Sequence, residues 1–134
     1  MNDTHFQLLL HAAKSQPEPQ RLLFVFAAAA LPVDASPAQK ARFEAGEGGE
    51  LEPIMCVDKD PSTLSSFATL AQESQLTGQA WQVVFVVGLS GRGQQAPTEK
   101  QTEQALNEMT EAVRQGHIGR YAAYDAQGEP LSFS

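Results

Sequence analysis

The sequence has little of several features that would assign a protein to a functional class at once. It contains one cysteine, Cys56, which excludes an intrachain disulfide and a zinc site built from several thiolates. Nine Lys and Arg residues stand against sixteen Asp and Glu, giving a net charge of −7. This shortage of positive charge argues against nonspecific binding to nucleic acid or to an anionic membrane. The longest apolar run, residues 22–31, is about half of a membrane-spanning helix.

What is present fits a soluble globular chain of ordinary composition. The 134 residues, 42% of them hydrophobic, predict a single domain over residues 1–134 with a core of its own. The first residues have neither a basic segment nor a signal-like apolar run. Together with the unpaired cysteine, this predicts a cytoplasmic protein.

Helical and extended patterns alternate along the chain. Apolar residues recur at helical spacing after His5, and Ser36, Asp60 and Thr98 are typical helix-capping residues, Thr98 with Gln101 as a capping box. Continuous or alternating apolar segments predict five strands, at residues 22–30, 54–57, 81–89, 120–124 and 131–133. A hairpin turn is expected at 125–128, before the last of them.

This alternation predicts an α/β fold, a layered single domain with a mostly parallel or mixed sheet of four to five strands and helices packed on it. The apolar runs 22–30 and 83–87 are expected to be central neighbours that are covered on both faces. The strand at 120–124 is expected at the periphery of the sheet.

Ligands of open α/β sheets bind at the carboxyl ends of the strands. Ser90, Gly91, Arg92 and Gly93 follow one predicted strand and Asp58 follows another. The glycines would let backbone amides approach an anion, Arg92 would clamp a phosphate, and Asp58 would act as an acid or base. The spacing matches neither a dinucleotide fingerprint nor a P-loop, so the alternative is a loop whose glycines serve its backbone angles.

Other reactive side chains form no catalytic or metal-binding constellation, and we expect no cofactor. Cys56 lies within the apolar run 54–57, which predicts a buried, inert thiol. The acidic stretch from Glu44 to Glu52 surrounds three glycines, and two interpretations stay open: a solvated connection, or a docking surface for a basic partner.

Three blocks of the sequence carry a resemblance that covers nearly the whole chain: residues 21–27 (RLLFVFA), 53–59 (PIMCVDK) and 89–93 (LSGRG). They resemble a family of short uncharacterised proteobacterial proteins that are often labelled ribonucleotide reductase subunit alpha. The resemblance implies a bacterial origin and a shared fold. It assigns no site, because that reductase chemistry needs a thiyl radical on one cysteine and a separate redox pair of cysteines, and Cys56 stands alone.

Two functional hypotheses follow from these residues. The first is a non-catalytic binding or regulatory module that acts through protein interaction, with a partner protein or as a homodimer; its expected contact surfaces are the strand at 120–124 and the first helix. The second is a binder of a small anionic ligand, a nucleotide or phosphate ester, or an enzyme acting on one, through residues 90–93. Neither involves nucleic acid or membrane as a partner.

Overall fold

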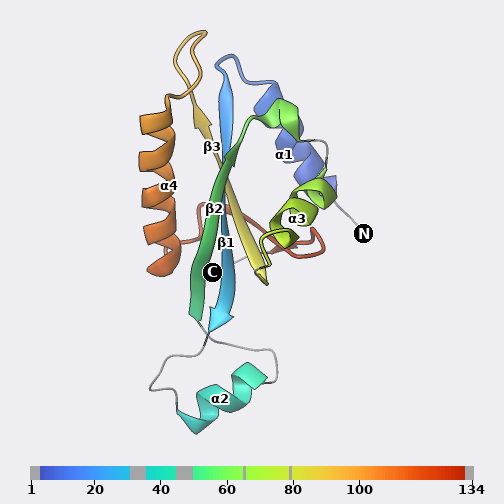
Figure 1. Ribbon diagram of the computed structural model, residues 1–134, viewed down its shortest axis with the longest axis vertical. Coiled ribbons are helices and arrows are strands. Elements are labelled where there is room, and N and C mark those ends of the chain that lie inside the picture. The colour runs from blue at the N-terminus through green and yellow to red at the C-terminus, as the bar shows by residue number, and fades with distance from the viewer. Residues whose placement is uncertain (1–3, 31–35, 45–49, 65, 79, 132–134) are drawn as a thin grey trace.

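The structure, a computed structural model, describes residues 4–30, 36–44, 50–64, 66–78 and 80–131. Within these residues, four α-helices, one 3₁₀ turn and five strands follow one another (Figure 1). In chain order these elements are α1 (Thr4–Lys14), β1 (Gln20–Ala30), α2 (Pro37–Glu44), β2 (Glu50–Lys59), η1 (Pro61–Thr63), α3 (Phe67–Gln75), β3 (Val83–Ser90), α4 (Glu99–Arg114), β4 (Ala122–Asp125) and β5 (Pro130–Leu131).

The five strands form one sheet in the order β2-β1-β3-β4-β5, and each neighbouring pair is antiparallel. The expectation of a mostly parallel or mixed sheet is therefore wrong. The expected strand neighbours are correct, since β1 and β3 lie side by side, with Phe24 opposite Val86.

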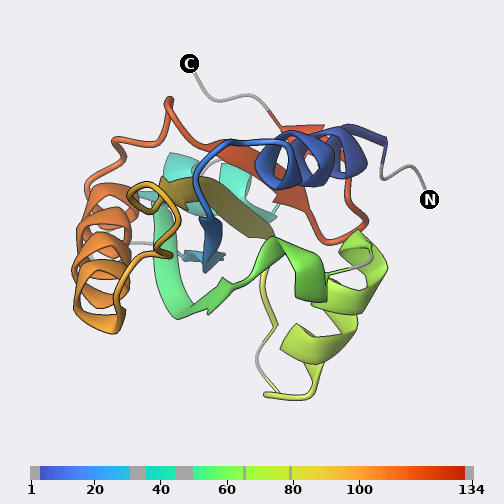
Figure 2. The ribbon, with the colours of Figure 1, turned by 90° about the horizontal axis from the view of Figure 1, so that it is seen from above.

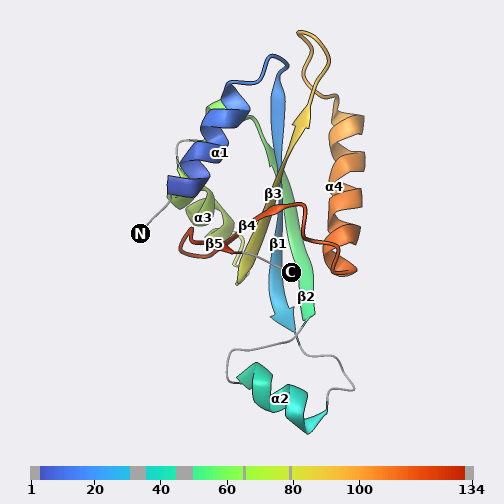
Figure 3. The same cartoon turned by 180° about the vertical axis from the view of Figure 1, so that it is seen from behind.

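The connections explain why alternating helices and strands gave the wrong pairing. The chain between β1 and β2 holds α2, which lies beyond the end of the sheet rather than on it (Figures 1 and 3), so β2 returns beside β1. The next connection, through α3, does cross over and makes β3 parallel to β2. However, β1 lies between these two strands, so no parallel pair forms.

Both faces of the sheet are covered, as Figure 2 shows: α1 and α3 lie on one face and α4 on the other. Alternate residues of β1 enter the two cores, since side chains along a strand point to opposite faces. Phe24 and Phe26 pack against α1 and α3, whereas Leu23 and Val25 pack against α4. This cover on both sides explains the continuous apolar sequence of β1 without parallel pairing.

Local signals at the helix ends are confirmed in most cases. Thr98 and Gln101 form the reciprocal capping box of α4, and Gly116 ends this helix with a positive φ of 80°. One prediction is wrong: Asp60 caps only the 3₁₀ turn η1, and α3 begins later, with Ser66 as its N-cap.

The predicted strand at 54–57 is longer than expected, and two predictions reach residues that the structure does not describe. Strand β2 runs from Glu50 to Lys59. The acidic stretch is divided between α2 and β2, and its central residues 45–49 lie outside the described residues, as does 132–133 of the last predicted strand.

Candidate functional site

The structure brings Asp58 and Ser90 to the same end of the sheet. Because β2 and β3 run in the same direction on either side of β1, both end beside the beginning of β1, where Asp58 lies opposite Leu23 and Ser90 opposite Gln20. The Gln20 side-chain amide donates to Ser90 Oγ over 2.7 Å. With β1 between them, the two strands are roughly 10 Å apart. Asp58 and the 90–93 loop therefore share an end of the sheet without being brought together.

Two of the loop amides that an anion would need already have backbone partners. Gly91 N–H donates to the carbonyl of Pro19 over 2.8 Å, and Arg92 N–H donates to that of Gln95 over 2.9 Å. Gly93 has a φ of +57°, as glycine has at the first central position of a tight hairpin turn. A Cβ on Gly91 would lie 1.9 Å from the Gln95 carbonyl oxygen. The conformation of the turn thus accounts for both glycines, and ligand binding at this loop stays a prediction.

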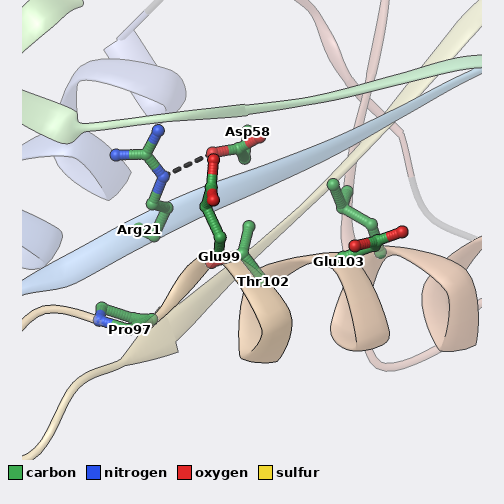
Figure 4. A pocket seen from close by; sticks show the side chains of 7 residues that line it. Arg21, Asp58, Pro97, Glu99, Thr102 and Glu103 are labelled. Atoms are coloured by element: carbon green, nitrogen blue, oxygen red, sulfur yellow. Dashed lines mark hydrogen bonds and ion pairs between the residues drawn. The ribbon is translucent and has the colours of Figure 1, made fainter.

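The partner of Asp58 is Arg21 of β1, not Arg92. The Nε–H of Arg21 donates to the Asp58 carboxylate (Figure 4). This pair forms part of the wall of a cleft of 610 Å³ between the sheet and the first turns of α4. The cleft is lined by Arg21, Asp58, Pro97, Glu99, Thr102, Glu103 and Leu106. Three carboxylates thus line the cleft together with one guanidinium, which is already paired with Asp58. The cleft, which we call the acidic cleft, suits a cationic group better than a phosphate.

A second cleft, of 450 Å³, lies on the opposite face of β2, between this strand and α3. Its lining is partly apolar, from Phe26, Met55, Val57 and Leu70, and partly polar or charged, from Asp58, Lys59, Glu73, Ser74 and Thr77. At the carboxyl end of β2, the ammonium group of Lys59 forms an ion pair with Glu73 Oε2 over 2.6 Å. We call this hollow the apolar cleft.

The two clefts flank β2, one of the two edge strands of the sheet. In Figure 1 β2 is drawn in front of β1, with α4 on one side and α3 on the other. The register of β1 with its neighbours shows which backbone N–H and C=O groups of β2 form no hydrogen bond within the sheet. The hydrogen bond from Gly91 to Pro19 means that odd-numbered residues of β1 direct their backbone groups toward β3 and even-numbered residues toward β2.

Applied to β2, this alternation makes Phe24–Val57 and Phe26–Met55 hydrogen-bonded pairs. The intervening Cys56, and Asp58 beyond, then direct their backbone N–H and C=O groups away from β1, toward the free edge. The side chain of Cys56 is exposed, so the prediction of a buried thiol is wrong. Because β2 is an edge strand, no neighbouring strand covers Cys56 on its free side.

Sequence reasoning missed this edge, although one residue signalled it. Proline lacks a backbone donor and is confined in sheets to edge strands, strand starts and bulges. Pro53 lies within β2, directly before the bulge that shifts the register between Phe26 and Ala27. The expected strand at 54–57 began after this proline and therefore did not include it.

The part of the chain that the structure describes contains neither a metal-binding cluster nor a membrane-spanning helix. There, no group of three or more His, Cys, Asp and Glu side chains is arranged to hold a metal ion. None of the described helices has the length and apolar character needed to cross a membrane.

Comparison with known proteins gives no match: no family model, no curated protein and no solved structure matches this chain.

Proposed function

We propose that this protein is a non-catalytic binding module that takes up an extended segment of a partner protein along the free edge of β2. The observation that carries the proposal is a ten-residue edge strand with a cleft on either face. In recognition by strand addition, main-chain hydrogen bonds supply affinity and pockets for alternate side chains supply specificity. The edge of β2 offers both elements.

The half of β2 that follows Pro53 is suited to accept a strand. Edge strands of natural proteins are commonly protected by prolines and bulges. Here Pro53 and the adjacent bulge protect only the first half, whereas pairing with β1 is regular from Met55 to Lys59. In this regular half, Cys56 and Asp58 offer backbone donors and acceptors toward the free edge.

The contact surfaces expected from sequence are replaced by this edge. The strand expected at 120–124 is not at the edge of the sheet, since Ala123 and Tyr124 of β4 pair with β5. The apolar face of α1 is used internally, because Phe6 and Leu10 are buried in the core. Neither leaves an extended apolar surface for a partner.

An anionic ligand receives no comparable support from the geometry. The amides of Gly91 and Arg92 are committed to backbone carbonyls, and Arg21 is committed to Asp58. The proposal includes a cytoplasmic location, supported by the exposed free thiol of Cys56, since reducing compartments keep such thiols unpaired.

The test uses a displayed library of short random peptides selected on the wild-type protein. We expect peptides that bind wild type and Cys56→Ser alike but lose binding to Cys56→Pro. Proline removes the outward N–H at this position without touching the bonds to β1, and serine keeps this donor. Equal melting temperatures of the two variants would exclude unfolding as the cause. Equal binding of selected peptides to both variants, or selection of none, would overturn the proposal.

A further inference from the structure

We infer that the segment bound by β2 alternates apolar side chains with lysine or arginine side chains. The inference rests on the proposed function and names the chemistry of its partner. It follows from the different lining of the two clefts: unpaired carboxylates in one, and apolar side chains beside paired charges in the other. The bound strand would contact the two clefts with alternate residues.

The register assigns each side chain of β2 to one face of the sheet. Val57 lies opposite Phe24, which belongs to the core under α1 and α3, so Val57 faces the apolar cleft. Asp58 lies opposite Leu23, which belongs to the core under α4, so Asp58 lies on the α4 face of the sheet, where it lines the acidic cleft. A strand added beside β2 continues the same pleat, and its successive side chains therefore reach the two clefts in turn.

The cleft beside α3 favours an apolar side chain. Met55 and Val57 from the strand and Leu70 from the helix contribute apolar surface, and methionine adapts to different shapes. Of the three charged residues in its lining, Lys59 and Glu73 are paired with each other and Asp58 is paired with Arg21. An apolar side chain can therefore enter without leaving any of these charges unpaired.

The cleft beside α4 favours a basic side chain. Arg21 neutralises Asp58, which leaves Glu99 and Glu103 as the excess charge of the lining (Figure 4). Within the described residues, neither of these glutamates has an ion-pair partner. Lysine and arginine have long aliphatic stems that can lie along the sheet while the cationic group reaches these carboxylates.

A second copy of the chain suits this edge poorly. Two copies joined antiparallel through β2 would be related by a two-fold axis and would place both acidic clefts on the same side of the joined sheet. Glu99, Glu103 and Asp58 of one copy would then approach those of the other, and like charges at an interface disfavour association.

The experiment compares three synthetic peptides of equal length: alternating valine and lysine, alternating valine and glutamate, and the valines and lysines of the first peptide in two separate blocks. We expect the first to bind tightest and to protect the amides of Cys56 and Asp58 from hydrogen exchange. Glu103→Gln should weaken its binding roughly two- to fivefold, the range for one exposed ion pair. Glu108→Gln, on the same helix but outside the acidic cleft, should leave binding unchanged.

The outcomes separate this inference from the proposed function. If the valine–glutamate or the block peptide binds as tightly, or if Glu103→Gln has no effect, the alternating basic pattern is overturned. Protection of the Cys56 and Asp58 amides by any of the peptides would still support strand addition. Protection of these amides in a concentration-dependent dimer without peptide would overturn the inference in favour of a second copy. Absence of protection in every case would overturn both proposals.

Discussion

Arg21 and Asp58 connect β1 and β2 by an ion pair on the face of the sheet that α4 covers. Asp58 lies opposite Leu23, so Arg21 reaches it diagonally across the two strands. About a third of each side chain is exposed, 36% for Arg21 and 31% for Asp58. The pair thus neutralises one carboxylate of the acidic cleft. Both of its side chains remain accessible to solvent and salt.

Asp58→Asn is expected to lower the free energy of unfolding by no more than about 1 kcal/mol, because exposed ion pairs contribute little. Urea unfolding at low and high salt measures this, and the difference from wild type should shrink as salt screens the pair. Glu111→Gln breaks the more exposed pair with Arg114 on α4 and serves as the control, with a smaller effect. A loss far above 1 kcal/mol that is insensitive to salt would contradict the exposed character of the pair.

Elements whose ends depend on local chemistry could be predicted from the sequence. Thr98 and Gln101 satisfy backbone donors within their own turn, and Gly116 adopts a backbone conformation that other residues avoid. The apolar runs of β1 and β3 could likewise be recognised as buried neighbours. Each of these predictions needs only a few adjacent residues.

Strand direction and the membership of the site could not be predicted, because they depend on which distant segments meet. A continuous apolar run such as Leu22–Ala27 indicates cover on both faces, which antiparallel and parallel sheets can both provide. Asp58 and Ser90 do lie at one end of the sheet, but they do so because β2 and β3 run in the same direction on either side of β1. The sequence alone does not reveal this arrangement. The guanidinium beside Asp58 comes from Arg21, thirty-seven positions away, rather than from Arg92 in the loop.

Ser74→Ala is expected to destabilise the protein by about 1–3 kcal/mol, the cost of leaving a buried donor unsatisfied. The Trp81 indole N–H donates to Ser74 Oγ over 2.7 Å, and both residues are buried. Urea unfolding followed by the fluorescence of Trp81, the single tryptophan, measures the loss. Gln72→Ala, at an exposed position of the same helix, should leave stability nearly unchanged. An unaltered Ser74→Ala protein would show that the indole has another partner.

The stability of the protein should fall at alkaline pH because of Tyr124. Burial raises the pKa of Tyr124 to about 12 from its ordinary value of 10.0. The folded state therefore favours the neutral phenol, and this contribution is complete below pH 10 and is lost as the pH rises through about 12. Urea unfolding across this range should show a decline in wild type that Tyr124→Phe lacks. A decline of equal slope in both proteins would contradict the assignment.

Tyr121→Phe provides the matched control at neutral pH. Tyr124 is hydrogen-bonded to His5 Nδ1 over 2.7 Å, so Tyr124→Phe should cost about 1 kcal/mol there. The Tyr121 hydroxyl is buried without a hydrogen-bond partner among the described residues, so its removal should cost nothing or stabilise the fold. A marked loss in Tyr121→Phe would show that this hydroxyl has a partner in solution.

Gly91→Ala should destabilise the turn that follows β3. The added Cβ would lie 1.9 Å from the Gln95 carbonyl oxygen, so the backbone must move, at a cost of roughly 1–3 kcal/mol. Gly119→Ala is the control, because a Cβ there meets no atom within 4 Å. Urea unfolding compares the two variants, and faster hydrogen exchange of the Arg92 amide would locate the damage. If the two substitutions have equal effects, the close approach at Gly91 does not exist in solution.

The thiol of Cys56 should react readily in the native protein. An exposed cysteine at a strand edge is open to reagents, whereas a thiol buried among apolar side chains is inert. With an aromatic disulfide reagent, we expect native and urea-unfolded protein to react at similar rates. A peptide that adds to β2 would lie beside Cys56 and should slow the native reaction, while the block peptide should not. Reaction only after unfolding would return Cys56 to the core and remove the free edge on which the binding proposal depends.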